Sequence, residues 1–360
     1  MERIVQTENL HEAFLRAARG KQCKVAVMAF RDDLHNQMCA IQRDLLAGRY
    51  AFGPYHYFTI YDPKRRIICA APFRDRVVFH AMMRICHPVF DNHQVCDSYA
   101  SRLGKGTYKA LERAGQMARR HRWFAKLDMV KYFDSIDHEV MMSQLCRLFK
   151  DGMLLRYFDD LIRGYSTLPG RGLPIGNLTS QYFANHYLSP ADHLLLERMG
   201  AKGMVRYMDD VLIFDNDTNR LKDVVACYSD HVRHSLRLDL HAPIINRTDC
   251  GVPFLGYVVK RDCLRLNGRS RRRFVRKMAQ WSVLVQQERV SIEQYAEHAT
   301  CLMAFARKAD VRQLMRKLSQ TPGMFPSGLQ PREPWWQLEQ QRQELPSVQP
   351  QQQHAVEHEQ

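Results

Sequence analysis

The stretch Val-Arg-Tyr-Met-Asp-Asp-Val-Leu-Ile-Phe, residues 205–214, decides the fold because it places two adjacent carboxylates inside an apolar run. The apolar residues on either side predict two short strands, with Asp209 and Asp210 at the tight turn between them. Two like charges cost free energy to hold together unless a cation neutralises them. Carboxylate oxygens suit Mg²⁺, which takes waters and phosphate oxygens as its remaining ligands. By itself the stretch also fits a solvated turn rich in aspartate.

A third carboxylate lies upstream and favours a metal site over a solvated turn. Residues 123–128, Trp-Phe-Ala-Lys-Leu-Asp, predict a strand that ends at Asp128. If this strand neighbours the hairpin in one sheet, its terminal carboxylate converges with Asp209 and Asp210. Three carboxylates that hold two metal ions about 4 Å apart form the type of catalytic site that performs in-line phosphoryl transfer. The alternative is that Asp128 only caps the segment that follows it.

The composition favours a polyanionic partner. The chain has 360 residues and a formal net charge of +15. Its length allows a large core and two or three subdomains. A basic body of this size favours nucleic acid, with charge for solubility alone as the alternative.

The ten cysteines are scattered, without a Cys-x-x-Cys pair or zinc-finger spacing. They predict reduced core thiols in a cytosolic protein. The first residues lack the apolar region of a signal peptide, and no apolar run approaches the ~20 residues that span a bilayer. We therefore expect a cytoplasmic protein, encoded by a bacterium or phage, without a membrane partner.

Periodicity and breaker residues predict the elements along the chain. We expect a β-hairpin over 50–71, a short strand over 253–259 and a loop rich in glycine and proline over 168–180. Helices are expected over 8–18, 31–47, 74–87, 139–164, 179–199 (kinked near Ser189 and Pro190) and 219–236, and in a basic segment from 268 to about 318. Residues 321–360 are rich in proline and glutamine and are predicted to be disordered.

Four motifs in a fixed order carry a resemblance to a known family. Asp128 is followed five residues later by Phe133, and then come Gly-Leu-Pro-Ile-Gly-Asn-Leu-Thr-Ser-Gln at 172–181, Tyr-Met-Asp-Asp at 207–210 and Phe-Leu-Gly at 254–256. In this order they resemble the reverse transcriptases, over about residues 8–315. The resemblance implies an α+β right-hand polymerase fold. Its parts are an N-terminal extension and fingers (1–122), a palm (123–260, with the loop 168–181), a basic helical thumb (261–320) and the tail (321–360).

The resemblance also implies the catalytic set. Asp128, Asp209 and Asp210 hold two Mg²⁺ ions, for which Mn²⁺ can substitute, and the Met129 carbonyl contacts a metal. The 3′-hydroxyl of a DNA or RNA primer on an RNA template attacks the α-phosphate of a deoxynucleoside triphosphate. Arg247 stands where relatives place a lysine that protonates pyrophosphate, and because arginine scarcely releases a proton, the general acid stays unassigned.

The nucleotide and the nucleic acid have their own expected contacts. Lys64 and Arg66 resemble the residues that hold the triphosphate. Phe133 leaves no room for a 2′-hydroxyl and so favours DNA synthesis, with core packing as the alternative. The residues expected at template or primer are Arg102, Lys105, Gly106, Ser180, Phe254, Leu255, Gly256, Arg269, Arg271, Arg272 and Arg273; the last four, in a basic run, are alternatively an exposed charged face.

The loop 174–181 distinguishes members of the family. Most reverse transcriptases carry Pro-Gln-Gly there, whereas this chain has Ile175 and Gly176, followed by Ser180 and Gln181. This pattern resembles the reverse transcriptases of diversity-generating retroelements. The resemblance implies copying of a template-repeat RNA into cDNA, with errors at template adenines that diversify a target gene, which is mutagenic retrohoming. It also implies a small basic accessory variability protein as a partner.

Ile175, Gly176 and Gln181 are then expected beside the nucleotide or templating base, with packing of Ile175 beneath the loop as the alternative. The alternative functions are another bacterial reverse transcriptase, stand-alone antiviral or retron-like, and a catalytically inert RNA-binding scaffold.

Overall fold

The computed structural model describes residues 1–61 and 64–321, which form two compact units. The first unit comprises Met1–Leu255 and Val259–Asp262, and the second comprises Gly256–Val258 and the residues from Cys263 onward. The expected mixture of helices and antiparallel strands, the α+β class, is confirmed. The predicted disorder of the proline- and glutamine-rich tail concerns residues that, from 322 onward, lie outside the described ranges.

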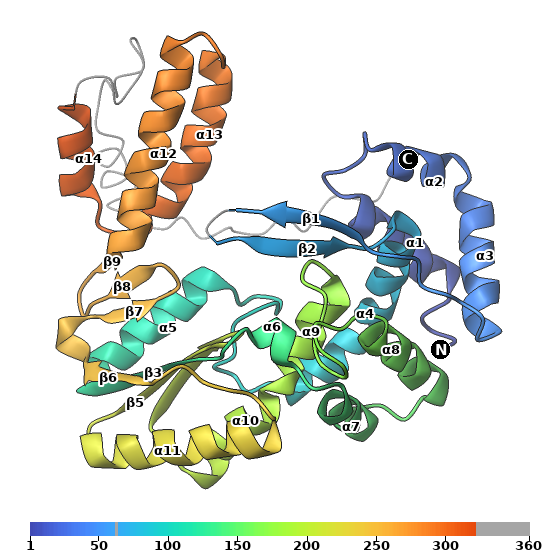
Figure 1. Cartoon of the computed structure of the whole chain (residues 1–360), viewed down its shortest axis with the longest axis horizontal. Coiled ribbons are helices and arrows are strands. Elements are labelled where there is room, and N and C mark those ends of the chain that lie inside the picture. The colour runs from blue at the N-terminus through green and yellow to red at the C-terminus, as the bar shows by residue number, and fades with distance from the viewer. Residues whose placement is uncertain (62–63, 322–360) are drawn as a thin grey trace, which may run out of the picture. The chain divides into compact units, whose positions relative to one another are not determined.

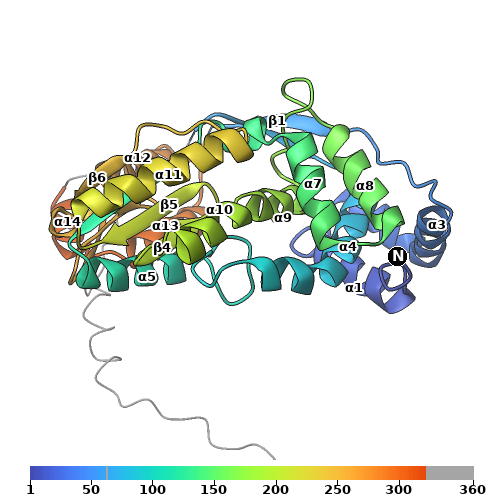
Figure 2. The same ribbon diagram turned by 90° about the horizontal axis from the view of Figure 1, so that it is seen from below.

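A four-stranded antiparallel sheet forms the centre of the first unit. The strand order is β4 (Gly203–Tyr207), β5 (Asp210–Asp215), β3 (Trp123–Asp128) and β6 (Ile244–Arg247). Helix α5 (Thr107–Arg120) covers one face and α11 (Thr218–Ser235) covers the other, as the two views in Figures 1 and 2 agree. Because both faces are covered, β4 and β5 are apolar almost throughout instead of alternating with polar residues.

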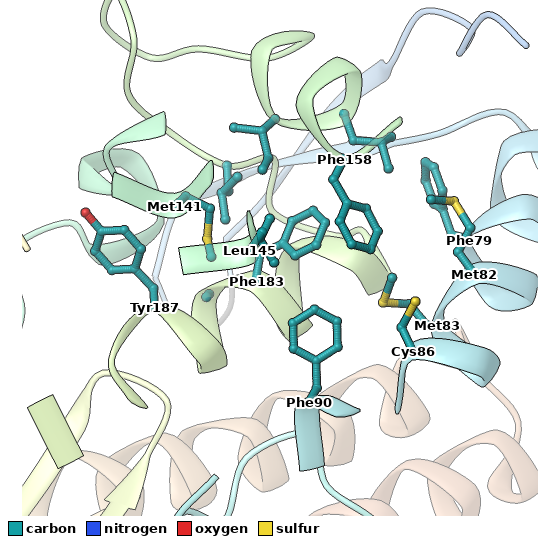
Figure 3. Packing of buried hydrophobic residues seen from close by; sticks show 14 of the residues in the cluster. Phe79, Met82, Met83, Cys86, Phe90, Met141, Leu145, Phe158, Phe183 and Tyr187 are labelled. Atoms are coloured by element: carbon teal, nitrogen blue, oxygen red, sulfur yellow. The ribbon is translucent and has the colours of Figure 1, made fainter. Parts of the chain in front are cut away.

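A helical core packs beside the sheet in the same unit. It is built by α4 (Phe73–His93), α7 (His138–Leu148), α8 (Gly152–Arg163) and α9 (Leu178–Tyr187), with α1 (Thr7–Ala18) against α4. Aromatic rings and sulfur-containing side chains fill the space between these helices (Figure 3). For example, the Phe158 and Phe183 rings meet edge to face with centroids 5.1 Å apart. This packing fixes α9, whose N-terminus follows the loop expected at the nucleotide.

The remaining elements complete the two units. In the first unit they are α2 (Val25–Asp32), α3 (Leu34–Leu46), the hairpin β1 (His56–Ile60) and β2 (Arg66–Ala70), α6 (Tyr132–Ser135), α10 (Ser189–His193) with a π-helical turn (Leu194–Arg198), a 3₁₀ turn (Thr248–Cys250) and β7 (Val252–Phe254). Strand β8 (Tyr257–Val259) is divided between the units, with Tyr257 and Val258 in the second and Val259 in the first. The second unit contains β9 (Leu264–Leu266), α12 (Gly268–Gln286), α13 (Ile292–Ala306) and α14 (Arg312–Ser319).

Several predicted elements are divided in the structure. The helix expected over 31–47 begins only at Leu34, because Asp33 breaks it from α2 and binds the side chains of the next turn. The helix expected over 139–164 is two helices, since the Asp151 carboxylate caps α8 at the Leu154 N–H, 2.9 Å away. The strand expected over 253–259 is two strands around a turn in which Leu255 and Gly256 have φ of 49° and 89°. The helix expected over 74–87 continues to His93.

The cysteine prediction is also wrong in part. All ten cysteines, which lie within the described ranges, are free thiols, but only Cys69 and Cys86 are buried. Scattered spacing without ligand pairs identified free thiols correctly, whereas burial cannot be deduced from spacing. Across residues 1–61 and 64–321, no helix combines the length and the apolar character that a membrane crossing requires.

Candidate active site

The β4–β5 hairpin and β3 bring the predicted acids to one end of the sheet. Tyr207 pairs with Asp210, so Met208 and Asp209 form a two-residue turn, with Met208 in the left-handed region at φ 57°. Asp128, the last residue of β3, lies directly opposite Asp210 in the antiparallel register. The expectation that the two acidic segments belong to neighbouring strands is therefore confirmed.

Burial and mutual repulsion disfavour ionisation of Asp209 and Asp210. Burial raises the pKa of Asp209, the negative charge of Asp128 adds to the effect, and the positive charges of Arg66 and Lys64 oppose it. Burial likewise raises the pKa of Asp210 to about 6, against the attraction of Lys126, whose Nζ donates to Asp210 Oδ2 at 2.9 Å. The other oxygen of Asp210 is buried and has no hydrogen-bond partner in the described part of the chain.

The donor set fits a hard divalent cation. Across residues 1–61 and 64–321, no three acidic, histidine or cysteine side chains already form a cluster that holds a metal ion, and Lys126 engages one of the three carboxylates. Nevertheless, a cation bound close to buried carboxylates stabilises their ionised form, and so opposes the rise in pKa that burial causes. The unpartnered Asp210 oxygen is a free ligand of the type that Mg²⁺ prefers. Asp128, Asp209 and Asp210 are therefore the residues that would hold such ions.

A buried arginine that we did not predict anchors the turn. Arg206 and Asp192 are both fully buried, and the Arg206 Nε lies 2.9 and 2.8 Å from the two Asp192 oxygens. The Arg206 guanidinium also donates to the carbonyl of Met208, inside the turn, at 3.1 Å, and to side-chain oxygens of Asn185 and Gln94 at 2.9 and 3.0 Å. The signal in the sequence was a charged residue in the middle of an otherwise apolar strand.

The β1–β2 hairpin presents positive charge toward the acids. The side chains of Lys64 and Arg66 are exposed and make no hydrogen bond or ion pair to other described residues. Their positive charges nevertheless act on Asp209.

Main-chain hydrogen bonds connect the loop before α9 to the β1–β2 hairpin and to α6. The Cys69 N–H in β2 donates to the Ile175 carbonyl at 2.8 Å, and the Leu173 N–H donates to the Phe133 carbonyl at 2.8 Å. Gly176 has φ of 118°, and a Cβ there would come within 2.8 Å of the Ile68 side chain. The close approach to β2 therefore requires glycine at this position.

Side chains around this loop are not equally accessible. Phe133 and Ile175 are half-buried and Gln181 is exposed, where its side chain accepts from the Ser101 hydroxyl at 3.2 Å. Ser180 is 1 % exposed, so the template contact expected for its side chain does not agree with this placement. Met129 is also buried, which leaves only its carbonyl for the role we predicted.

The residues expected at template and primer differ in their exposure and in whether their side chains are already hydrogen-bonded. The Arg102 guanidinium is held by Asp91 Oδ1 at 2.6 Å and by the Val95 carbonyl at 2.7 Å, and the Lys105 ammonium donates to the Cys96 carbonyl at 2.7 Å. These bonds give Arg102 a structural task in the loop that precedes α5. Gly106, at φ 108°, is the N-cap residue immediately before that helix.

Phe254 is 1 % exposed and packs in the core, which favours packing over primer contact for its ring. Leu255 and Gly256 form the turn after β7. In the second unit, Arg269, Arg271 and Arg272 are exposed along the first turns of α12, and Arg273 is half-buried.

Comparisons with known proteins agree with this geometry. Residues 62–259 match the family described as reverse transcriptase (RNA-dependent DNA polymerase). The COX1/OXI3 intron 1 protein of Saccharomyces cerevisiae is 28% identical over 166 residues, which cover 43% of this chain and 20% of that protein. Protein YkfC of Escherichia coli K12 is 25% identical over 173 residues, which cover 44% of this chain and 45% of that protein. The chain thus spans less than half the length of either relative.

Solved structures of telomerase are similar at a lower level. The Candida albicans telomerase, solved with a fragment of telomeric RNA, aligns at a TM-score of 0.46 with 14% identity over 76% of this chain and 55% of that one. The apo telomerase of Candida tropicalis aligns at 0.48 with 10% identity over 61% and 49% of the two chains. These scores are low, and the assignment rests on the family match.

Proposed function

The chain belongs to the reverse transcriptase family, and from this premise we propose that it is an RNA-directed DNA polymerase. One observation carries the proposal. Asp128 ends β3 directly opposite Asp210, and Asp209 precedes Asp210 in the hairpin turn. Three half-buried carboxylates at one end of a sheet, with Lys126 as their one ion-pair partner among the described residues, fit a site for phosphoryl transfer.

In the proposed reaction, Asp128, Asp209 and Asp210 hold two Mg²⁺ ions, with the Met129 carbonyl as a further oxygen ligand. When bound, these ions lower the pKa of the primer 3′-hydroxyl and stabilise the charge on the leaving oxygen. Lys64 and Arg66 bind the triphosphate, because their exposed charges act on the same acids. Arg206 holds the Met208 carbonyl and so keeps the Asp209 turn in place. The general acid for pyrophosphate stays unassigned, since Arg247 is engaged by Asp249.

We assign the parts of the chain accordingly. Residues 1–122 form the N-terminal extension and fingers, 123–260 the palm and 261–320 the thumb. Lys105 and Gln181 bind the template, while Leu255 and Gly256 bind the primer. The exposed free thiols, such as Cys39 and Cys146, suit a reducing cytoplasm.

Primer extension tests the polymerase directly. The protein is incubated with an RNA template annealed to a DNA primer, the four deoxynucleoside triphosphates and Mg²⁺. We expect extension to the template end, and no extension when EDTA replaces Mg²⁺. A protein that binds the template–primer but never extends it, with Mg²⁺ or Mn²⁺, would instead be an inert RNA-binding scaffold.

We further propose that the chain belongs to the diversity-generating subtype, with mutagenic copying of a template-repeat RNA. The support is Ile175 and Gly176 followed by Ser180 and Gln181, because an apolar branched side chain replaces the amide that most relatives place in this loop. Ile175 is held beside β2 by its carbonyl, which keeps its half-buried side chain near the hairpin that carries Lys64 and Arg66. Loss of a hydrogen-bonding amide there loosens selection of the base pair.

Sequencing of the cDNA tests the subtype. The reaction contains a template-repeat RNA and the small basic accessory protein that the subtype implies. We expect substitutions concentrated at template adenines, and we expect Ile175→Gln to reduce them. Faithful copying of adenines would contradict the diversity-generating subtype and would favour a reverse transcriptase of the stand-alone antiviral or retron-like kind.

Phe133 gives a prediction on sugar selection. Its ring is half-buried, lies edge-on to Tyr132 with centroids 5.9 Å apart, and follows the end of β3. We expect Phe133→Ala to raise ribonucleotide incorporation relative to deoxynucleotide incorporation by about 10–100-fold, because the steric block to a 2′-hydroxyl is removed. Competition between the two triphosphates measures the ratio, and the rate with deoxynucleotides alone is the internal control. An unchanged ratio would assign Phe133 to packing.

The arginines that begin α12 give a prediction on salt dependence. We expect the triple substitution of Arg269, Arg271 and Arg272 by glutamine to weaken binding of template–primer. The slope of log K against log salt should fall by roughly 2–3, since about one counterion is released for each phosphate neutralised. Fluorescence anisotropy across a salt series measures this. Replacing the exposed Arg316 and Lys317 of α14 is the control, and an equal effect there would mean general charge attraction only.

A further inference from the structure

A second hollow lies in the first unit, away from the acids. Its volume is about 610 Å³, within the range of small-molecule sites. The residues that decide its chemistry come from α4, α7, α9, the π-helical turn and α11: His93, Gln144, Arg147, His186, Arg198 and His231. None of the residues assigned to the polymerase site lines it.

Three of these side chains present polar atoms without partners. His186 is 1 % exposed, and neither ring nitrogen has a hydrogen-bond partner in residues 1–61 and 64–321. Gln144 is 8 % exposed, and its Oε1 is unpartnered within the same ranges, although its amide nitrogen donates to the Tyr187 carbonyl at 3.2 Å. The Nε2 of His231 is likewise buried without a described partner. Buried polar groups are rarely left unsatisfied, so three around one hollow indicate that something binds there.

The protonation state of His186 determines which hydrogen bonds its ring nitrogens can make with a ligand. Burial lowers the pKa of His186 to about 3, helped by His93 and Arg206 and opposed by the Gln144 carbonyl, which one ring N–H approaches without normal hydrogen-bond geometry. His186 is therefore neutral, and its other ring nitrogen is a free acceptor. Beside it, Gln144 Oε1 is an acceptor. Leu148, Pro190 and Leu194 add apolar surface to the lining. A flat group with an apolar face and an edge of alternating donors and acceptors fits such walls.

The mouth of the hollow carries positive charge. Arg147 and Arg198 are exposed, and neither makes a hydrogen bond or ion pair with a described residue. Glu197, an acid in the lining, is engaged by His193 at 2.6 Å. His193 also lies 2.9 Å from the His93 carbonyl, so both of its ring nitrogens donate and the ring carries a charge of its own. The charge at the mouth therefore suits an anion such as phosphate.

We propose that this hollow is a second nucleotide site, with a nucleobase against His186 and Gln144 and its phosphate on Arg147 and Arg198. Two sources supply this chemistry: a free nucleoside monophosphate, or a single nucleotide of an RNA strand. The inference does not rest on DNA synthesis, because the hollow and its unpartnered groups exist independently of the acids.

Equilibrium binding tests the proposal separately from polymerase activity. The protein carries Asp209→Asn and is kept in EDTA, so that metal-dependent binding at the polymerase site is suppressed. One arm titrates AMP, GMP, CMP and UMP by calorimetry. The other arm titrates a fluorescent oligoribonucleotide. We expect saturable binding in at least one arm, weakened about tenfold or more by Arg147→Ala with Arg198→Ala.

Matched variants separate a site from general attraction. Gln144→Leu changes no charge and nearly preserves volume, and we expect it to weaken the same binding. Arg233→Ala, on α11 but outside the lining, should leave it unchanged. Thermal melts confirm that each variant is folded. Dependence on Gln144 in only one arm identifies the source. No binding in either arm, meaning water alone fills the hollow, would overturn the proposal, as would equal losses in Arg233→Ala or no loss in Gln144→Leu.

Discussion

Asp209→Asn should reduce templated DNA synthesis by about 10²–10³-fold or more, because it removes a carboxylate that would hold the metal ions, and losing one stabilising group at a developing charge costs about this much. Asp209 sits in a two-residue turn, so the amide occupies the same place without rearranging the strands. Single-turnover primer extension with saturating deoxynucleotide measures the loss. Binding of template–primer should remain, since it depends on basic residues elsewhere in the chain.

The same substitution should stabilise the fold in the absence of metal. A raised pKa means that the folded protein holds the proton more tightly than the unfolded chain, so ionisation of Asp209 at neutral pH disfavours folding. Asparagine removes that cost, and the melting temperature of Asp209→Asn in EDTA at pH 7.5 should exceed that of the parent. The difference should shrink as the pH falls toward the ordinary carboxyl range, where the parent also becomes neutral. A less stable variant would mean that Asp209 is a structural acid.

Arg206→Met should give the largest loss of stability. The substitution leaves Asp192 as an unpaired charge in a fully buried position, and breaking a buried pair from one side costs about 3–5 kcal/mol. Urea unfolding measures the difference in free energy. The Arg206→Met substitution should also lower the rate of DNA synthesis, because the Met208 carbonyl loses its hydrogen-bond donor and the turn that carries Asp209 becomes less fixed.

A double variant separates these two effects. Arg206→Met with Asp192→Leu removes both charges, so much of the stability should return. The rate should not return, since no donor then reaches the Met208 carbonyl. Recovery of both would mean that Arg206 supports the fold alone and does not position the acids.

The catalytic hairpin was predictable because local chemistry determines it. Apolar runs separated by two residues have few alternatives to a β-hairpin, and the order of motifs placed β3 beside it. By contrast, Arg206 was missed because strand patterns treat an isolated charge as an interruption, and only the three-dimensional structure shows Asp192 and Asn185 around it.

Other errors arise because a sequence pattern does not show how residues contact one another in the folded chain. Periodicity continues through a break when the residues on both sides are helix formers, so Asp33 and Asp151 divided helices that the pattern joined. The roles expected for Ser180 and Arg102 came from position in a motif, which says nothing about whether a side chain is buried or already bonded. The hollow around His186 combines residues from six helical elements that are far apart in the sequence, so no short stretch of sequence reveals it.

Anomalous diffraction from Mn²⁺ in crystals of the protein with template–primer and a non-reactive deoxynucleotide analogue tests the central claim most directly. We predict manganese within about 2.0–2.4 Å of carboxylate oxygens of both Asp128 and Asp209, with Asp210 released from Lys126 or bridging through water. Nucleotide bound with no manganese at these acids, or manganese held by other residues, would contradict the account.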